Sequence, residues 1–125
     1  MSGVIPDVIG NLQSLVELDL SDNKLTGSLH SNMGDLTMLQ TLKLNSNNLQ
    51  YGIPTEFGNL HELSMLELSN NGIESIPGEL FSLKNLQTLS LSYNRISGSL
   101  PLEVGLASSL MLLDLSHNKF SNKLT

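Results

Sequence analysis

The sequence predicts a repeat solenoid of the α/β class, in which short parallel strands stack into one sheet and irregular segments return on the opposite side. Three observations lead to this prediction. The pattern L-x-x-L-x-L-x-x-N recurs five times at spacings of 24, 24, 23 and 24 residues, a second block with glycine and proline follows each copy, and 28 of the 125 residues are leucine. Five matches in phase indicate stacked copies of one structural unit.

Each copy of the pattern is expected to form a short strand that enters a turn. In the first copy, Leu15 and Leu18 are three residues apart and Leu18 and Leu20 are two apart, so neither a helical period nor strict alternation fits. Alternate side chains of the strand point inward as leucines and outward as variable residues. No copy can bury its leucines alone, whereas parallel pairing of neighbouring copies at about 4.8 Å closes a continuous core.

The asparagine that closes each copy is predicted to belong to an internal ladder of hydrogen bonds. A carboxamide has two donors and an acceptor, which can bridge the turn below and the turn above. Leaving such a buried group unpaired costs roughly 1–3 kcal/mol, so these residues are expected to support the fold and not to touch a partner. The ladder residues are Asn23, Asn47, Asn71, Asn94 and Asn118.

The second block, roughly x-L-x-G-x-I-P-x-x-L-G-x-L, is predicted to form an irregular or 3-10 return on the convex side. Proline fixes φ and lacks a backbone donor, so regular hydrogen bonding ends at its position, which His30 and Thr125 take in the first and last copies. The prolines at this position are all four in the chain: Pro6, Pro54, Pro77 and Pro101. Three glycines are expected to permit a turn that a side chain would hinder: Gly3, Gly27 and Gly98.

The copies together predict one domain over residues 1–125. Its parts are a partial repeat at 1–14, repeats at 15–38, 39–62, 63–85 and 86–109, and a truncated repeat at 110–125. Met1 falls inside one repeat and Thr125 inside another, so both ends are expected to expose leucine core, and the chain has no cysteine for a disulfide-bonded cap. We therefore expect neighbouring repeats or caps outside this segment, or a partner that covers the ends.

These motifs resemble the leucine-rich repeat family. The segments LVELDLSDNKLTGSLHSNMGDLTM and LQTLSLSYNRISGSLPLEVGLASS, with the Gly-x-Ile-Pro block, are similar to the plant-type subclass of receptor-like kinases and receptor-like proteins. Three residues depart from that subclass: Ser75 and Phe81 in the third repeat, which resembles the intracellular Ras-associated type, and Tyr51 in the second. The resemblance implies a right-handed superhelix, or horseshoe, with a parallel concave sheet and a non-catalytic role in binding a protein or peptide.

Composition excludes several classes of partner. Twelve carboxylates against six Lys and Arg give a net charge of −6, and no basic stripe is present to bind nucleic acid or anionic lipid. The longest strongly apolar run is residues 110–113, far too short to insert into a membrane. No export signal follows Met1.

The residues predict neither an enzyme nor a cofactor or metal site. His30, His61 and His117 fall on different surfaces and are expected to be solvated. The chain has no Cys/His metal spacing, Ser-His-Asp arrangement, phosphate-binding loop or kinase signature. Calcium takes six to eight oxygen ligands, and only three carboxylates gather at one end of the sheet: Glu17, Asp19 and Asp22.

A partner is predicted to bind the outward side of the concave sheet. Met65 and Leu112 are expected as exposed apolar contacts, and Tyr and Arg are favoured interface anchors. Another row across the strands holds Asp19, Lys43, Glu67, Ser90 and Asp114. Its charges either neutralise one another on the surface or form a charge code that selects a ligand. The predicted contact residues are Met65, Glu67, Ser90, Tyr93, Arg95, Leu112, Asp114, His117 and Lys119.

Two functions remain open from the sequence. The Gly-x-Ile-Pro block favours a recognition module of a plant-type receptor in signalling or defence, on the extracellular side of the plasma membrane. Zero cysteines, and thirteen asparagines without one N-x-Ser/Thr sequon, favour an intracellular scaffold or sensor, which would be cytoplasmic. A purely structural spacer does not explain apolar and aromatic residues on the open face.

Overall fold

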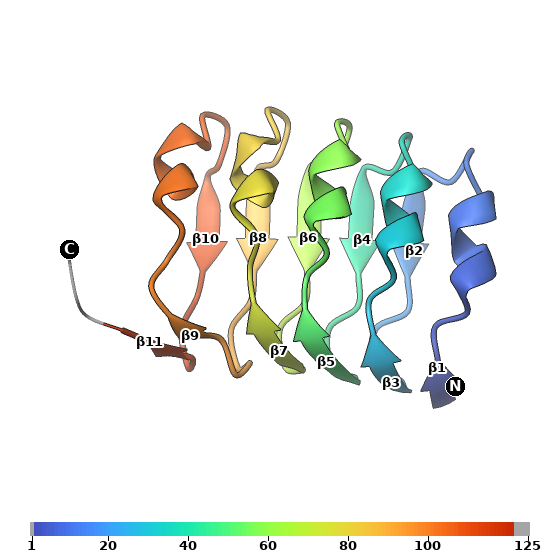
Figure 1. Cartoon of the computed structure of the whole chain (residues 1–125). Coiled ribbons are helices and arrows are strands. Elements are labelled where there is room, and N and C mark those ends of the chain that lie inside the picture. Colours follow the sequence, from blue (N-terminus) through green and yellow to red (C-terminus); the bar gives the residue numbers. More distant parts are fainter. Residues whose placement is uncertain (1, 122–125) are drawn as a thin grey trace.

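The computed structural model describes residues 2–121 and confirms the predicted solenoid (Figure 1). Five parallel strands, one from each repeat, form the concave sheet in the order β10-β8-β6-β4-β2. A full coil of the chain separates each strand from the next, which is why the pairing is parallel. Met1 and Thr125, where the ends of the domain were predicted, lie outside the described residues. The strands of the concave sheet are β2 (Glu17–Asp19), β4 (Thr41–Lys43), β6 (Met65–Glu67), β8 (Thr88–Ser90) and β10 (Leu112–Asp114).

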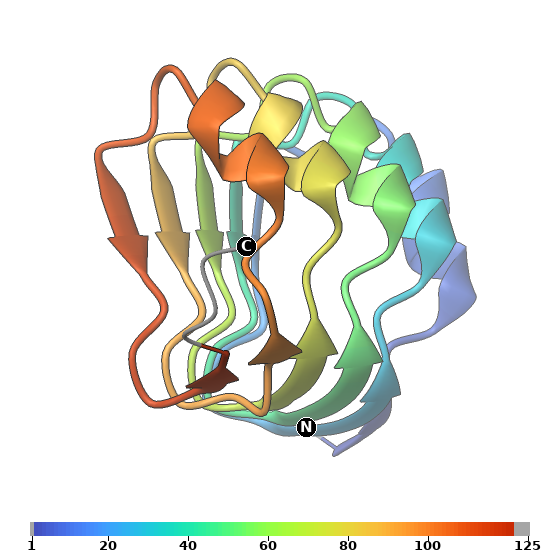
Figure 2. The ribbon, with the colours of Figure 1, turned by 60° about the vertical axis from the view of Figure 1, so that its left-hand side comes forward.

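Short 3-10 helices form the convex side, as predicted. Each begins directly after the proline position, where the backbone is extended, with φ −62° and ψ 146° at Pro54 and φ −89° and ψ 143° at His30. Figure 2 shows the helices stacked on the side of the core opposite the concave sheet. The helices are η1 (Asp7–Asn11), η2 (Ser31–Asp35), η3 (Thr55–Asn59), η4 (Gly78–Ser82) and η5 (Leu102–Leu106).

A second parallel sheet runs along the lower edge of the coils in Figure 1, which the sequence did not predict. Its order is β1-β3-β5-β7, and β9 and β11 form a separate two-stranded pair beyond it. The turn predicted at the glycines is confirmed, with positive φ of 87° at Gly3, 81° at Gly27 and 82° at Gly98. Tyr51 takes the same position with φ 68°, and the pairing with the next strand shifts register after it. The strands are β1 (Ser2–Val4), β3 (Lys24–Ser28), β5 (Asn48–Gly52), β7 (Gly72–Ser75), β9 (Ser97–Gly98) and β11 (Lys119–Phe120).

The core lies between the concave sheet and the helices. Leu42, Leu66 and Leu89 of the central strands have no accessible surface, and Phe57 and Phe81 of the convex side are equally buried. The equivalent leucines of the outer strands β2 and β10 are only partly buried. Apolar burial therefore peaks in the middle of the stack, because each coil is covered only by its neighbours.

Asparagine carboxamides join consecutive coils beneath the concave sheet. The Asn71 side chain accepts from the Leu49 backbone N–H at 3.0 Å, and its Nδ2 donates to the carbonyl oxygens of Leu44 at 3.0 Å and Leu68 at 3.1 Å. Asn47, Asn94 and Asn118 repeat this arrangement, and the Nδ2 of Asn23 donates to Leu20 and Ser21. The carboxamides of Asn47, Asn71, Asn94 and Asn118 thus serve the backbone of their own coil and the preceding one.

Candidate partner-binding surface

The outward face of the concave sheet carries two rows of side chains. Residues in register across the five strands form the first row: Glu17, Thr41, Met65, Thr88 and Leu112. Leu112 is 54 % exposed, whereas Met65 is half-buried. An exposed leucine on a regular strand has no structural purpose in the described coils, so it marks this part of the face as a contact candidate.

The second row is the predicted row of charges, in register as Asp19, Lys43, Glu67, Ser90 and Asp114. Hydrogen bonds from the Ser21 hydroxyl at 2.6 Å and the Ser21 N–H at 3.0 Å lower the pKa of Asp19 below its ordinary value, and Lys43 adds a smaller coulombic effect. The same bonds from Ser116 lower the pKa of Asp114. Ser90 is only 8 % exposed and offers a partner little surface.

A ridge of left-handed backbone connects the concave sheet to the lower edge. The residue before each ladder asparagine has φ between 57° and 61°, although none of them is glycine. We call these five residues the left-handed ridge: Asp22, Ser46, Asn70, Tyr93 and His117. Their backbone N–H groups donate to the next coil, as from Asn70 to Ser92 at 2.9 Å and from Tyr93 to Ser116 at 3.0 Å. The ridge therefore presents side chains in a fixed spacing, and all of them except the half-buried Ser46 are exposed.

Two aromatic rings stack at the C-terminal end of the ridge. The ring centroids of Tyr93 and His117 are 4.1 Å apart and the planes differ by 9°. Tyr93 is 58 % exposed, and His117 is also exposed. The stacked pair is a flat, amphipathic platform with a polar atom at each tip, a surface suited to protein contacts.

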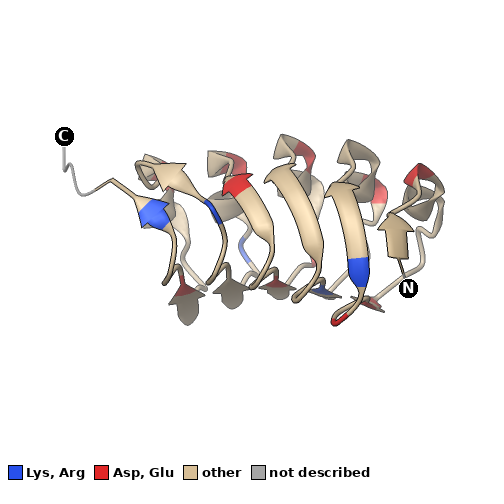
Figure 3. Ribbon diagram, turned by 90° about the horizontal axis from the view of Figure 1, so that it is seen from below, with Lys and Arg blue, Asp and Glu red and all other residues tan. Residues whose placement is uncertain are grey.

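Arg95 and Lys119 do not lie on the concave sheet, which corrects the prediction for these two residues. Lys119 begins β11, and Arg95 lies two residues before β9, with its backbone N–H donating to Ile73 on β7 at 2.9 Å. Two residues before each of them, a left-handed residue (Tyr93 or His117) turns the chain away from the concave sheet. Figure 3, viewed from below, shows Lys and Arg residues on segments along this lower edge. The predicted contact residues thus divide between the concave sheet, the ridge and the lower edge.

His30 is not the solvated residue that the sequence suggested. It is half-buried, and its Nε2 forms a hydrogen bond of 2.6 Å with the carbonyl oxygen of Ile5 in the preceding coil. A proline at this position has no group able to make that bond, so the histidine supports packing between coils. His61 and His117 are exposed.

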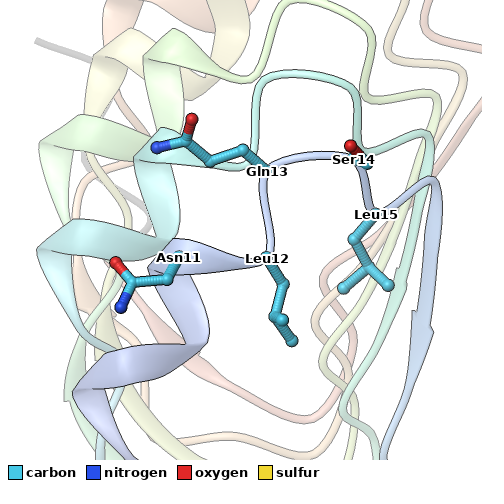
Figure 4. A pocket seen from close by; sticks show the side chains of 5 residues that line it. All are labelled: Asn11, Leu12, Gln13, Ser14 and Leu15. Atoms are coloured by element: carbon cyan, nitrogen blue, oxygen red, sulfur yellow. The ribbon is translucent and has the colours of Figure 1, made fainter.

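Hollows in the surface differ in chemistry. Figure 4 shows the larger one, of about 450 Å³, at the N-terminal end of the core, where Leu12 and Leu15 point into the space between η1 and β2. It contains none of the predicted contact residues. A smaller cavity of about 130 Å³ lies at the lower edge and is lined by Asn47, Asn48, Gln50, Asn70, Asn71, Gly72 and Arg95.

The sequence did not predict the polar cavity, although the row of residues after the ladder asparagines has one feature that relates to it. The position after each ladder asparagine holds Lys24, Asn48, Gly72, Arg95 and Lys119. Glycine in the middle of this row removes a side chain between long polar neighbours. Seeing its consequence required the second sheet, in which Gly72 of β7 pairs with Gln50 of β5.

The part of the chain described here has no group of three or more His, Cys, Asp or Glu side chains able to hold a metal ion. None of the helices between residues 2 and 121 has the length and apolar character needed to cross a bilayer.

Comparison with known proteins identifies the repeat. The family described as "Leucine rich repeat" matches residues 13–73, 39–96 and 61–120. A search of curated protein sequences gives no match.

Several solved structures that are similar to this chain are of plant proteins. The ectodomain of the membrane receptor kinase GASSHO1/SCHENGEN3 from Arabidopsis thaliana, in complex with CASPARIAN STRIP INTEGRITY FACTOR 2, is 33% identical with a TM-score of 0.93, over 95% of this chain and 14% of that chain. The Arabidopsis receptor kinase HAESA, in complex with the peptide hormone IDA and the co-receptor SERK1, is 34% identical with a TM-score of 0.91, over 95% of this chain and 20% of that chain. A plant ice-binding protein is 34% identical with a TM-score of 0.88, over 95% of this chain and 39% of that chain. This chain spans only a small part of each of these structures.

Proposed function

The chain belongs to the leucine-rich repeat family, and from this premise we propose that it is a recognition module that binds a peptide or a protein on its concave side. The observation that carries the proposal is the exposure of Leu112 on β10 together with the exposed, stacked rings of Tyr93 and His117. Apolar and aromatic groups on an otherwise polar face are the usual anchors of interfaces.

The contact surface that we propose has an apolar and an ionic part. Met65, Leu112 and the platform of Tyr93 and His117 supply the anchors. Around them lie Glu67, Ser90, Asp114, Arg95 and Lys119. A standard interface buries about 800 Å² on each partner, and the three-residue strands of this segment offer a small area, so the affinity of the isolated chain is expected to be low.

We place the module in a receptor-like protein with a role in signalling or defence. The Gly-x-Ile-Pro block and the likeness to the ectodomains of GASSHO1/SCHENGEN3 and HAESA support this assignment. The structure with HAESA contains a peptide hormone and a co-receptor, and by analogy the ligand proposed for this chain is an extended peptide. In this proposal residues 1–125 act as one domain of consecutive repeats, on the extracellular side of the plasma membrane.

An intracellular scaffold or sensor is the second candidate. It is supported by the absence of cysteine and of N-x-Ser/Thr sequons from the sequence. The ice-binding protein among the neighbours illustrates that one fold serves different activities, so the site and not the fold must decide between candidates.

We further propose that the module is non-catalytic. Leucine-rich repeat domains of this kind are typically binding modules. His61, Glu62 and Ser82 line one surface hollow, but the Ser82 hydroxyl donates to the Glu79 carbonyl oxygen at 2.7 Å, so it is not paired with a base as nucleophilic catalysis requires.

Selection of random linear peptides against the 125-residue chain tests the proposal. Selected peptides are expected to bind at least tenfold more weakly to the double variant Tyr93→Ala, Leu112→Ala, while its melting temperature changes little because both side chains are exposed. Glu56→Ala, on the exposed convex side, is the control and should bind as the parent does. Equal binding by the parent and the double variant would remove this surface as the site.

A further inference from the structure

The polar cavity at the lower edge lies beside the proposed contact surface and has a chemistry of its own. We propose that it is a carboxylate-binding subsite, which takes an aspartate or glutamate side chain of the bound peptide. That the carboxylate comes from a bound peptide rests on the proposed function. That the cavity prefers a carboxylate rests on the residues that line it. Nothing in the repeat pattern requires a hollow at this position.

Gly72, which has no side chain, is one of the residues that line the cavity. Gly72 pairs with Gln50 of β5 on one side, and on the other side the Arg95 backbone N–H bonds to Ile73, the next residue of β7. The equivalent positions in the neighbouring coils carry Asn48 and Arg95, so long polar side chains flank an empty position. A Cβ built on Gly72 would lie 3.1 Å from the Leu49 carbonyl oxygen, a tight contact, and 3.6 Å from the Cγ of Gln50, which lines the hollow.

The groups that line the cavity favour a single negative charge. Arg95 is the one ionisable residue among the seven that line it. Within residues 2–121 its guanidinium makes no ion pair, and the side chains of Asn48 and Gln50 make no hydrogen bond. A planar guanidinium together with carboxamide N–H donors matches the two oxygens of a carboxylate.

The floor of the cavity is rigid. Asn47 and Asn71 line it, but their Nδ2 groups are committed to ladder carbonyls, with bonds of 3.0 Å to Leu20 and Leu44. These two carboxamides therefore hold the geometry and are not available to rearrange around a ligand. A preformed site loses less conformational entropy on binding.

Size and charge select the ligand further. Pockets for whole small molecules measure about 300–1,000 Å³, whereas this cavity of about 130 Å³ accommodates one functional group. The net charge of −6 opposes multiply charged anions such as phosphate. A singly charged carboxylate fits both limits.

The position of the cavity indicates that the carboxylate belongs to a peptide. Asn70 of the left-handed ridge is part of its lining, and the backbone N–H of Asn71 donates to the carbonyl oxygen of Tyr93 at 3.3 Å. The cavity and the stacked rings are therefore adjacent along the ridge. A peptide anchored on the rings can place an acidic side chain in the cavity without crossing to another face.

NMR titration of the 125-residue chain tests this assignment. The probes are N-acetyl-glutamate N-methylamide, its neutral isostere N-acetyl-glutamine N-methylamide, sodium acetate and inorganic phosphate, at constant ionic strength. We expect saturable shifts of the Arg95 Nε–H and of the Asn48 and Gln50 side-chain amides with the two carboxylates. Stronger binding of the glutamate derivative than of acetate identifies a peptide side chain as the ligand, and stronger binding of acetate overturns that part of the proposal. Preferential binding of phosphate, or equal shifts with the glutamine derivative, overturns the carboxylate assignment.

Two variants and a matched control complete the experiment. Arg95→Gln removes the charge, and Gly72→Asn fills the cavity with the residue that the preceding coil carries at Asn48; both are expected to weaken the glutamate derivative at least tenfold. Lys24→Gln makes the same change of charge at the same repeat position, three coils away from Arg95, and should leave the affinity unchanged. If Lys24→Gln weakens binding of the glutamate derivative as much as Arg95→Gln does, the overall charge of the chain and not the cavity controls binding, and the subsite is refuted. The probes are small and do not reach the rings, so the two proposals can fail separately. If library peptides bind the chain but the small carboxylates do not, the subsite alone is refuted. If the small carboxylates bind but library peptides do not, the proposed function alone is refuted.

Discussion

A single carboxamide of the ladder satisfies backbone groups in two coils at once. Asn71 accepts one hydrogen bond from the coil below and donates to carbonyls of both coils, at distances of 3.0–3.3 Å. No other neutral side chain of this size has an acceptor and two donors in that arrangement. The contribution of the residue to the fold therefore depends on its chemistry and not on its burial.

Replacing Asn71 by alanine is expected to lower the free energy of unfolding by about 1–3 kcal/mol. The Leu49 N–H is left without its partner, and the Leu44 carbonyl keeps only the hydrogen bond from Asn47. Chemical denaturation monitored by circular dichroism measures the change. Asn48→Ala serves as the control, since Asn48 is exposed and its side chain makes no hydrogen bond within residues 2–121, and it should cost less than about 0.5 kcal/mol. Similar losses for the two variants would contradict the role of the ladder.

Serine residues two positions after the aspartates of the concave sheet control their ionisation. The bonds from Ser21 lower the pKa of Asp19, so this interaction stabilises the folded chain above the pKa of the unfolded state, about 4, and is lost as the pH falls through the lower folded value. Ser21→Ala is expected to raise the pKa of Asp19 in an NMR titration of its carboxyl carbon and to leave the pKa of Asp114 unchanged. Ser116→Ala should do the opposite. A common shift of both carboxyls in either variant would show that net charge, and not the local bonds, sets the pKa.

At the scale of the elements, the convex helices pack closely because glycine recurs within them. A Cβ on Gly34 in η2 would lie 2.5 Å from the backbone oxygen of Glu56 in the next helix, and one on Gly10 would meet Asn32 at the same distance. Gly105 in η5 occupies the same repeat position, and a Cβ there would meet nothing within 4 Å. In the third repeat Phe81 takes this position and is buried in the core.

Gly34→Ala is expected to destabilise the chain by about 1–3 kcal/mol, since the helices must separate to admit the methyl group. Gly105→Ala introduces the same methyl group into open space and should be neutral or slightly stabilising. Thermal unfolding of the two variants against the parent gives the comparison. Equal melting temperatures for the two variants would show that the helices are not in close contact in solution.

The elements differed in how far the sequence could predict them. The strands of the concave sheet follow from leucines such as Leu66 and Leu68, because their spacing alternates directly. The second sheet was missed because its strands, such as β5, carry no alternating leucines, and because the path into them depends on the left-handed residues before them. Nothing in the side chains of Tyr93 or His117 favours a positive φ, which the neighbouring coils impose.

For the whole molecule, stability is expected to be greatest in the central coils. Leu66→Ala should cost about 2–5 kcal/mol, because the residue is fully buried between two coils, whereas Leu113→Ala in the outer strand β10 should cost less. Hydrogen exchange should follow the same order, with backbone amides of β4, β6 and β8 protected longer than those of β10. Uniform protection along the chain would instead indicate one cooperative unit without weak ends.

The candidate surface was predictable only in part. The sequence placed Met65 and Leu112 in one outward row, because the register of parallel repeats follows from their spacing. It could not place Arg95, since the path of the chain after the ladder asparagine depends on backbone dihedral angles that no side-chain pattern encodes. The polar cavity, which needs Arg95 and Gln50 from different coils, could not be seen for the same reason.

The reach of each ladder carboxamide has a consequence for how such chains change over generations. Every bond of Asn47, Asn71 and Asn94 ends within its own coil or the one before it. Duplication or loss of a gene segment that encodes one complete coil therefore leaves all remaining bonds with a partner of the same kind. The concave surface can therefore lengthen or shorten by whole coils while the hydrogen bonds of the asparagine ladder stay the same.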